Sequence, residues 1–225
     1  MYSGYGKWII EFLSKPPRDS ELTIVIRHSE RPDFKNIPMS LWNRVLLTQR
    51  GEEAATEFGV ALAVEAHFSS ITAHGWGLER CVKTAKNIVD GAISAGSNAV
   101  YTTLTDFKSP IENLDLYNNY LQTGKYFDMI EDWFSSNPTM SPFTPYDQYS
   151  RHIILRLINE HMQLTNNLTV IVTHDLHILP LLNYVFGSKT RELGFMDGII
   201  IAKSGNKLKF FSNNCSKNLS CDDFH

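Results

Sequence analysis

The sequence predicts an α/β protein of the three-layer α/β/α class, with a mostly parallel sheet and an antiparallel C-terminal hairpin. Short apolar runs alternate along the chain with segments of helical periodicity. The runs 22–26 and 168–172 are almost continuously apolar, which is typical of strands covered on both faces. The C-terminal segment GIIIAKSGNKLKFF indicates two strands joined at Gly205-Asn206, because glycine supplies the positive φ that a tight turn requires.

The remaining elements follow from periodicity and capping residues. Thr48 can cap a helix in which Ala55, Phe58, Leu62 and Ala66 recur at helical spacing. Pro180 is tolerated in the last predicted helix only if it lies in the first turn. In chain order, the pattern predicts a docked surface helix at 8–13, a strand at 22–26, the helix after Thr48, a strand at 68–73, a helix at 79–92, strands at 100–104 and 168–172 with a helix at 149–162 between them, and a helix at 176–186.

Residues 108–146 differ in composition from the rest of the chain. They are rich in Tyr, Phe, Asn, Ser and Pro, as in SSNPTMSPFTPYDQY. Such a composition favours an irregular or part-helical excursion of the kind that often covers a site. We therefore expect one domain over residues 1–225, with a small cap-like excursion at about 108–146.

Composition restricts the functional class. Of the 225 residues, 43% are hydrophobic and 20% charged, which suits a soluble globular protein. A net charge of -3 leaves no basic excess for nucleic acid, and no apolar run approaches the roughly 20 residues of a membrane span. The N-terminus lacks signal-peptide features, and Cys81, Cys215 and Cys221 have no metal-ligand spacing. We expect a cytoplasmic protein without nucleic-acid or membrane partners; nothing indicates an oligomeric state.

Two predicted strands end in ionisable residues. The first runs into Arg27-His28, with Arg31 close behind, and the strand at 168–172 runs into His174-Asp175. Ligands of parallel sheets bind beyond the carboxyl ends of the strands, so these residues should meet there. Guanidinium groups match phosphate oxygens, and an imidazole can act as a ligand, acid, base or nucleophile. The pattern predicts an oxyanion pocket with a nucleophile beside it.

Four segments resemble the histidine phosphatase superfamily, the phosphoglycerate mutase-like proteins. Residues 27–32, RHSERP, resemble the motif RHGxRxP, and residues 47–51, LTQRG, with the alanines after them, resemble LTxxGxxxA. Residues 78–85, LERCVKTA, resemble LxRxxxTA. Residues 173–175, THD, resemble the late histidine-aspartate pair of the acid-phosphatase-like branch. Four segments in the family's order are more specific than any single motif.

The resemblance implies a phosphomonoester hydrolase that needs neither a metal nor an organic cofactor and acts on a small-molecule phosphate ester. His28 would be the nucleophile and form a phosphohistidine. Asp175 would protonate the leaving alcohol and then help to activate water. Four side chains would hold the phosphoryl oxygens: Arg27, Arg31, Arg80 and His174.

Departures from the family pattern leave other assignments open. Ser29 replaces the usual glycine, and His74-Gly75-Trp76-Gly77 replaces a serine-proline run, so His74 and Trp76 are possible substrate contacts. Glu112 is the alternative acid, as in the mutase-like branch, and Asp106 is a weaker one. We prefer Asp175 because its adjacent histidine fits the other branch, although its position also suits a helix N-cap.

Two other functions remain under consideration. A phosphomutase would use Glu112 and shield the phosphoenzyme from water. A catalytically degenerate phospholigand- or protein-binding module is opposed by the intact set of arginines and histidines. His177 is expected on the surface of a helix. A group of aromatic residues is expected mainly in the core of the excursion, with substrate contact the minority interpretation: Tyr117, Tyr120, Tyr126, Phe127 and Trp133.

Overall fold

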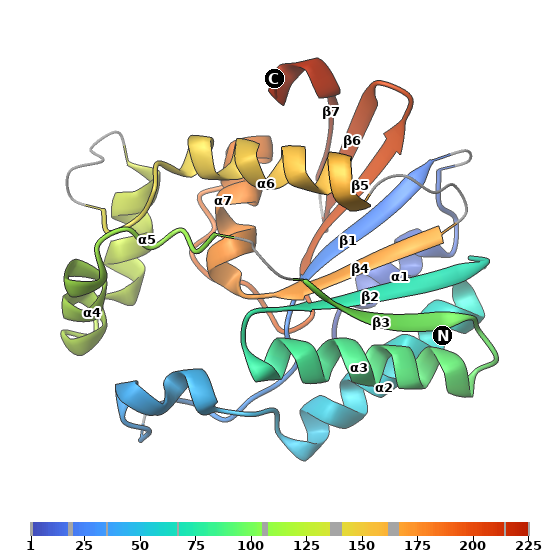
Figure 1. Ribbon diagram of the computed structural model, residues 1–225, viewed down its shortest axis with the longest axis horizontal. Coiled ribbons are helices and arrows are strands. Elements are labelled where there is room, and N and C mark those ends of the chain that lie inside the picture. Colours follow the sequence, from blue (N-terminus) through green and yellow to red (C-terminus); the bar gives the residue numbers. More distant parts are fainter. Residues whose placement is uncertain are drawn as a thin grey trace.

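The computed structural model describes residues 2–17, 20–34, 36–66, 68–104, 108–135, 141–161, 167–213 and 215–224. Its strands form a seven-stranded sheet in the order β3-β2-β4-β1-β5-β6-β7 (Figure 1). The first four strands in this order are parallel, whereas β5, β6 and β7 pair antiparallel with their neighbours. The predicted sheet, mostly parallel with antiparallel C-terminal strands, is confirmed.

The strands are β1 (Glu21–Arg27), β2 (Ser70–Trp76), β3 (Ala99–Leu104), β4 (Asn167–Thr173), β5 (Gly198–Ser204), β6 (Lys207–Ser212) and β7 (Cys215–Ser220). The helices are α1 (Lys7–Leu13), α2 (Gln49–Glu65), α3 (Glu79–Ser94), α4 (Leu114–Gln122), α5 (Tyr126–Phe134), α6 (Tyr146–His161) and α7 (Asp175–Phe186), with short 3₁₀ helices η1 (Met39–Arg44) and η3 (Cys221–Phe224). None of the helices in the described ranges is long and apolar enough to cross a bilayer.

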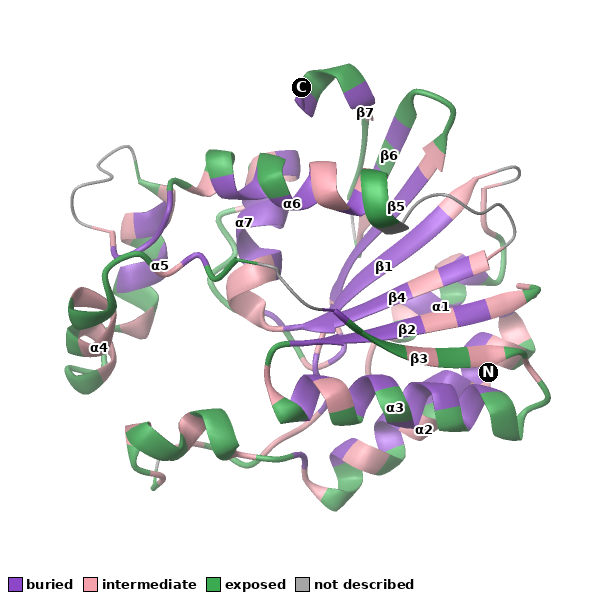
Figure 2. Cartoon of the chain, in the orientation of Figure 1, coloured by how far each residue is buried: buried purple, intermediate pink, exposed green. Residues whose placement is uncertain are grey.

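Helices cover both faces of the sheet, as the three-layer prediction requires. Ile24 and Ile26 of β1 pack into a core with α1, α2 and α3, whereas Val25 packs on the opposite face with α6 and α7. The central strands are therefore buried along most of their length (Figure 2). This two-sided burial explains why the run 22–26 has no polar alternation.

Several local predictions agree with the structure. The Thr48 side chain caps α2 by accepting a hydrogen bond from the N–H of Gly51 at 2.9 Å. Gly205 adopts a φ of 58° at the turn between β5 and β6. Strand β2 begins later than predicted and continues to Trp76, because its main chain pairs with both β3 and β4. Strand β7 was missed, since its sequence CSKNLS is polar and its residues lie at the exposed edge of the sheet.

The expectation for Pro180 was wrong. Pro180 lies in the second turn of α7, as the sixth residue of the helix, and is buried. Proline has no N–H to donate to the carbonyl of Leu176, so the helix lacks one internal hydrogen bond. Packing of the surrounding residues Ile178, Leu179 and Leu181 into the core holds the helix across this position.

The excursion at 108–146 is part-helical in its described portion. An antiparallel bridge between Ile111 and Phe143 closes it, and α4 and α5 lie between these residues, beyond the carboxyl ends of the parallel strands (Figure 1). Trp133 is buried against Phe143 and donates its indole N–H to the carbonyl of Thr144 at 2.7 Å. Trp133 thus belongs to the core of the excursion.

Gly51 permits the close approach of α2 to the loop that follows β1. A Cβ atom at this position would lie 2.1 Å from the carbonyl oxygen of Glu30, which also accepts the N–H of Thr48. The Glu30 side chain points toward Thr48 and Tyr5, from which it accepts hydrogen bonds of 2.9 and 2.5 Å. This packing fixes the main chain immediately before Arg31.

We expect Gly51→Ala to lower the free energy of unfolding by roughly 2 kcal/mol, because the added methyl group overpacks a main-chain contact. Alanine has a higher helix propensity than glycine, which by itself would stabilise the protein, so a loss of stability would have to come from the contact with Glu30. Urea denaturation measures the difference. Gly194→Ala is the control, since its Cβ would meet only Asp197 Cβ at 3.8 Å. Equal stability of Gly51→Ala and the wild type would contradict this account.

Candidate active site

His28 and His174 lie side by side because β1 and β4 are adjacent and parallel. Arg27 pairs with Thr173 at the ends of these strands, and the N–H of His28 donates to the carbonyl of Thr173 at 2.9 Å. The two imidazole rings then meet edge to face, with centroids 5.5 Å apart. The predicted meeting of charged residues at this edge therefore follows from strand order.

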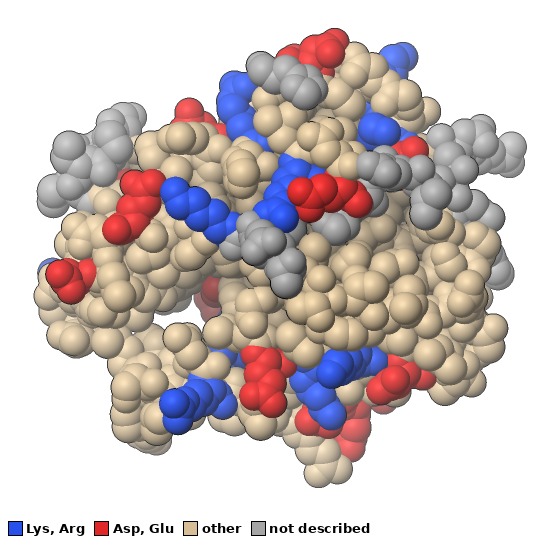
Figure 3. Space-filling model, viewed as in Figure 1, with Lys and Arg blue, Asp and Glu red and all other residues tan. Residues whose placement is uncertain are grey.

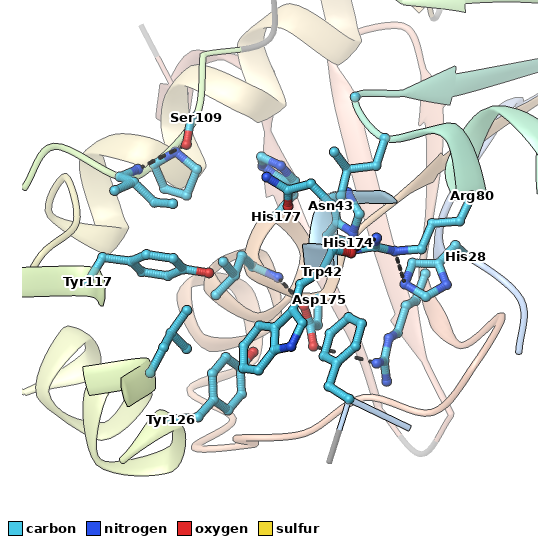
Figure 4. Close-up of a pocket in the computed structure, with 18 of the residues that line it drawn as sticks. His28, Trp42, Asn43, Arg80, Ser109, Tyr117, Tyr126, His174, Asp175 and His177 are labelled. Carbon is cyan, nitrogen blue, oxygen red and sulfur yellow. Dashed lines mark hydrogen bonds and ion pairs between the residues drawn. The ribbon is translucent and has the colours of Figure 1, made fainter. Parts of the chain in front are cut away.

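The hydrogen bonds of His28 select one tautomer of its ring. Nδ1 lies 2.7 Å from the carbonyl oxygen of Ser29, which can only accept, so Nδ1 carries the proton. Nε2 is left unprotonated and accepts a hydrogen bond from Nε of Arg80 at 3.1 Å (Figure 4). Burial, with the nearby charge of Arg80, lowers the pKa of His28 to about 2. The ring is therefore a neutral base or nucleophile throughout the physiological range.

Arg27 is held by main-chain and aromatic groups of the loop before β5. Its guanidinium donates to the carbonyl of Leu193 and lies 4.8 Å from the ring centroid of Phe195. One terminal nitrogen is 3.8 Å from the carboxylate of Asp175, and Nε is buried without a hydrogen-bond partner among the described residues. These contacts hold the guanidinium of Arg27 in the wall of the cavity that it lines.

Arg80 and Arg31 complete a group of three guanidinium ions. Arg80 comes from the first turn of α3, is 6% exposed, and donates to the carbonyl of Trp42 at 3.0 Å. Arg31 lies 3.3 Å from the ring centroid of Phe34 and donates to the carbonyl of Pro32 at 2.7 Å. Burial and the charges of the other two arginines lower the pKa of Arg31 to about 10. Arg31 remains a cation at neutral pH, and the combined positive potential of the three arginines favours the binding of an anion.

His174 and Asp175 begin α7. His174 occupies the N-cap position, so Asp175 is the first helical residue, and its Oδ1 accepts the N–H of Leu176 at 3.0 Å. Burial and the three arginines lower the pKa of His174 to about 3. Sγ of Cys81 is 3.5 Å from Nε2 of His174, and burial raises the pKa of this thiol to about 12. Cys81 is thus a protonated packing neighbour, as expected for a core residue.

These residues line one end of a cavity of about 590 Å³. Its walls come from the segment around η1, from the end of β2 and from the excursion, and Figure 3 shows the surface hollowed between the η1 side and the excursion. Tyr117 and Tyr126 extend into the cavity with their hydroxyl groups directed toward Asp175 (Figure 4). Burial, with the charge of Asp175, raises the pKa of Tyr117 to about 12, so it is a neutral donor.

The other predicted site residues have different positions. Trp76 lines the cavity. The next residue, Gly77, has a φ of 82°, a conformation that glycine adopts readily and that the segment His74-Gly75-Trp76-Gly77 therefore permits. His74 does not line the cavity; its Nδ1 lies 2.5 Å from Oγ1 of Thr102. Glu112 also lies outside the lining, where it accepts a hydrogen bond from Thr144 at 3.0 Å and faces Lys108. Asp106 lies outside the described residues.

The expectation that His177 lies on the helix surface was wrong. His177 lines the cavity, packs against Trp76 with ring centroids 3.8 Å apart, and its Nδ1 makes a hydrogen bond with the Tyr149 hydroxyl. Burial lowers its pKa well below the usual range. Its separation of three residues from His174 on α7 placed it on the same helix face, and that spacing was the available signal.

Sequence reasoning also missed aromatic residues outside the excursion. Phe34 and Trp42 form a stacked pair, with ring planes 7° apart, and both line the cavity. Among the aromatic residues of the excursion, Tyr117, Tyr126 and Phe127 line the cavity. Tyr120 instead donates to Asp132 at 2.5 Å within the excursion.

The arrangement can bind a tetrahedral oxyanion and bring a nucleophilic nitrogen to its centre. Three guanidinium groups supply charge-assisted donors, and Nε2 of His28 supplies an electron pair. The carboxyl group of Asp175 lies 3.8 Å from Arg27 and can exchange a proton with a bound group. Within the described ranges, no cluster of three or more His, Cys, Asp or Glu side chains has a metal-binding arrangement.

Comparison with solved structures identifies the fold. A phosphoglycerate mutase from Bacillus anthracis str. Sterne aligns with a TM-score of 0.52 and 15% identity, over 90% of this chain and 93% of that one. A mycobacterial glucosyl-3-phosphoglycerate phosphatase, in complexes with VO3, aligns with a TM-score of 0.50 and 12% identity, over 89% and 97%. The chain has the phosphoglycerate mutase-like fold. No family model and no curated protein matches the sequence.

Neighbours of this phosphoglycerate mutase-like fold include both phosphatases and mutases. At 15% and 12% sequence identity, the structural similarity establishes the fold of this chain but not its reaction. The fold predicted from the four sequence segments is thus confirmed.

Buried neutral histidines should make stability depend on pH. The unfolded chain binds a proton at His28 below about pH 6.5, whereas the folded chain does not, so stability falls as pH falls. Between pH 7.5 and pH 5, this one residue should reduce the free energy of unfolding by about 2 kcal/mol. We expect the free energy of unfolding of His28→Gln to depend less on pH over this range, because the variant takes up about one proton fewer when it unfolds.

Denaturant titrations in phosphate-free buffer at both pH values test this expectation. The control is His152→Gln, because His152 is exposed on α6 and the variant makes the same chemical change outside the core. The account of a buried neutral His28 is wrong if His28→Gln and the wild type lose equal stability over this range.

Proposed function

We propose that the protein hydrolyses phosphate monoesters through a phosphohistidine at His28. The observation that carries this proposal is a cavity lined by three guanidinium groups, one of which, Arg80, contacts the unprotonated Nε2 of the buried His28. The fold supports it, because its neighbours include a glucosyl-3-phosphoglycerate phosphatase and a phosphoglycerate mutase. The substrate would be a small phosphate ester, held without a metal ion by Arg27, Arg31, Arg80 and His174.

In the first step, Nε2 of His28 attacks phosphorus and the ester P–O bond breaks. The donor from Arg80 moves from Nε2 to a phosphoryl oxygen, which it reaches without a large movement because it already contacts the nucleophile. Positive charge develops on the ring as the N–P bond forms. The carbonyl of Ser29, which accepts from Nδ1, stabilises that charge.

Asp175 supplies the proton that the leaving oxygen needs. Its carboxyl group lies beside Arg27, at the phosphate end of the cavity and on the side that faces Tyr117 and Tyr126. After the alcohol departs, the carboxylate accepts a proton from water, which attacks phosphorus and breaks the N–P bond. Inorganic phosphate is released and neutral His28 is restored.

We expect His28→Ala to lower kcat on 4-nitrophenyl phosphate by about a thousandfold or more, because the nucleophile is removed. Release of 4-nitrophenol measures the rate, and wild-type activity should survive a chelator. Rapid quenching should trap an acid-labile, alkali-stable phosphoenzyme in the wild type and not in the variant. The control is His152→Ala, which changes an exposed histidine of α6.

Equal activity of His28→Ala and the wild type would rule out the phosphohistidine route. Phosphate should appear in equal amount to the alcohol. Transfer to a second hydroxyl of the same substrate, without free phosphate, would instead identify a mutase.

We expect Asp175→Asn to lose activity in proportion to the leaving group's need for a proton. The loss should be about 10²-fold or more on benzyl phosphate and much smaller on 4-nitrophenyl phosphate, whose phenolate leaves unassisted. The wild-type rate on benzyl phosphate should rise toward acidic pH, because the acid must carry its proton while His28 stays neutral. Asp175→Asn should lack this rise.

Glu112→Gln is the matched comparison for the acid assignment. Glu112 faces Thr144 and Lys108 outside the cavity lining. This change should therefore alter the rates on benzyl phosphate and on 4-nitrophenyl phosphate by no more than about twofold. A leaving-group-dependent loss in Glu112→Gln, with Asp175→Asn unaffected, would reverse the assignment in favour of the mutase-type acid.

A further inference from the structure

We infer that the substrate's leaving group is a flat, uncharged aromatic group that bears a single phosphate. This inference rests on the proposed phosphatase function and adds the class of ester that the cavity accepts. It follows from the distribution of charge, rings and hydrogen-bonding groups around the cavity.

Among the described residues that line the cavity, positive charge is found at the phosphate end. The lysine and arginine residues that line the cavity, within the described ranges, are Arg27, Arg31 and Arg80. All three lower the pKa of His174 through their charges, so they act on one small region. A second phosphate or a carboxylate on the leaving group would find no further lysine or arginine among the described lining residues. It would instead share the cavity with Glu192.

One apolar wall starts directly at the phosphate end. The main-chain carbonyl of Trp42 accepts from Arg80, and the indole of Trp42 stacks on Phe34 with centroids 4.6 Å apart. Phe34 in turn lies under the guanidinium of Arg31. An aromatic group attached to a phosphate held by Arg31 and Arg80 would therefore begin beside these rings.

The opposite wall comes from the excursion and is also apolar. The apolar and aromatic side chains that line this wall come from α4, from α5 and from the residues shortly before α4. They are Pro110, Ile111, Tyr117, Leu121, Tyr126 and Phe127. At the end of β2, Trp76 is 6% exposed and supported by His177. Two apolar walls facing one another favour a flat ring between them, because aromatic stacking adds to the transfer free energy of the ring.

Polar side chains also line the cavity away from the phosphate end; within the described ranges they are Asn43, Ser109, Tyr117, Tyr126, His177 and Glu192. The hydroxyls of Tyr117 and Tyr126 are directed toward Asp175 (Figure 4), and Oγ of Ser109 accepts the N–H of Ile111 at 3.2 Å. A sugar or glycerol group placed between the two apolar walls would bury hydroxyls against side chains that offer no partner, which is unfavourable. A cavity of about 590 Å³ has the size of small-molecule sites generally, so an aromatic ester would fit.

The test compares esters whose leaving alcohols are both primary and need similar protonation. We expect kcat/KM for benzyl phosphate to exceed that for glycerol 3-phosphate by about tenfold or more, because burial of the ring stabilises the bound state. 3-Phosphoglycerate should be poorer still, since its carboxylate would share the cavity with Glu192 and, in the described part of the chain, with no cation beyond the three arginines. Each rate is measured in the wild type and in His28→Ala.

Variants locate the preference in the cavity walls. Trp42→Ala and Phe127→Ala should each lower kcat/KM for benzyl phosphate about threefold or more, with a smaller effect on glycerol 3-phosphate. The carbonyl of residue 42 that binds Arg80 is kept, and Phe127 is 47% exposed, so the second variant retains the fold. Leu114→Ala is the control, because Leu114 is 60% exposed on α4 and does not line the cavity.

The outcomes separate the two proposals. If glycerol 3-phosphate and benzyl phosphate are hydrolysed equally well, and both need His28, the aromatic preference is wrong and the phosphatase proposal stands. If no ester is hydrolysed, the phosphatase proposal fails, and calorimetry with phosphonates still tests the cavity. Benzylphosphonate should then bind about tenfold tighter than methylphosphonate, and equal affinities would overturn the inference.

Discussion

Mutual repulsion among three guanidinium groups in one cavity is the constraint on which the rest of the site depends. Charges removed from water are costly unless they are compensated. The protein compensates chiefly with dipoles and rings: Arg27 contacts the Leu193 carbonyl and Phe195, Arg80 the Trp42 carbonyl, and Arg31 the Pro32 carbonyl and Phe34. Asp175 lies 3.8 Å from Arg27, and Asp33 acts on Arg31, so carboxylates offset part of the positive potential and the remainder is available to an anion.

The same field determines the state of the histidines. His28 and His174 are buried beside cations, so both stay neutral, and the Ser29 carbonyl selects the tautomer of His28. Neutral rings do not add to the repulsion among the arginines. They also cannot supply a proton at ordinary pH, so the proposed reaction needs a proton from another group. Asp175, the first residue of α7, is a carboxyl group at the same strand edge.

Sequence predicted the phosphate end far better than the rest of the cavity. Arg27, His28, His174 and Asp175 lie at the ends of apolar strands, and adjacent parallel strands bring such ends together by geometry alone. The mostly parallel character of the sheet, the part-helical excursion and the β5–β6 hairpin likewise follow from local patterns. Strand β7 and the second-turn Pro180 depend on edge pairing and core packing, for which the local sequence carries no signal.

The leaving-group end depends on contacts between segments distant in sequence, which explains why it was not predicted. Phe34 and Trp42 acquire their position through the Arg80 hydrogen bond, and His177 through Trp76 and Tyr149. These contacts join the segment around η1, the end of β2 and helices α6 and α7 to the cavity. The guanidinium groups and His28 are thus positioned by residues at strand and helix ends, whereas the other end of the cavity is shaped by how the covering segments pack. In the proposed phosphatase, substitutions in those segments would change the preferred alcohol while the guanidinium cluster and His28 remain in place.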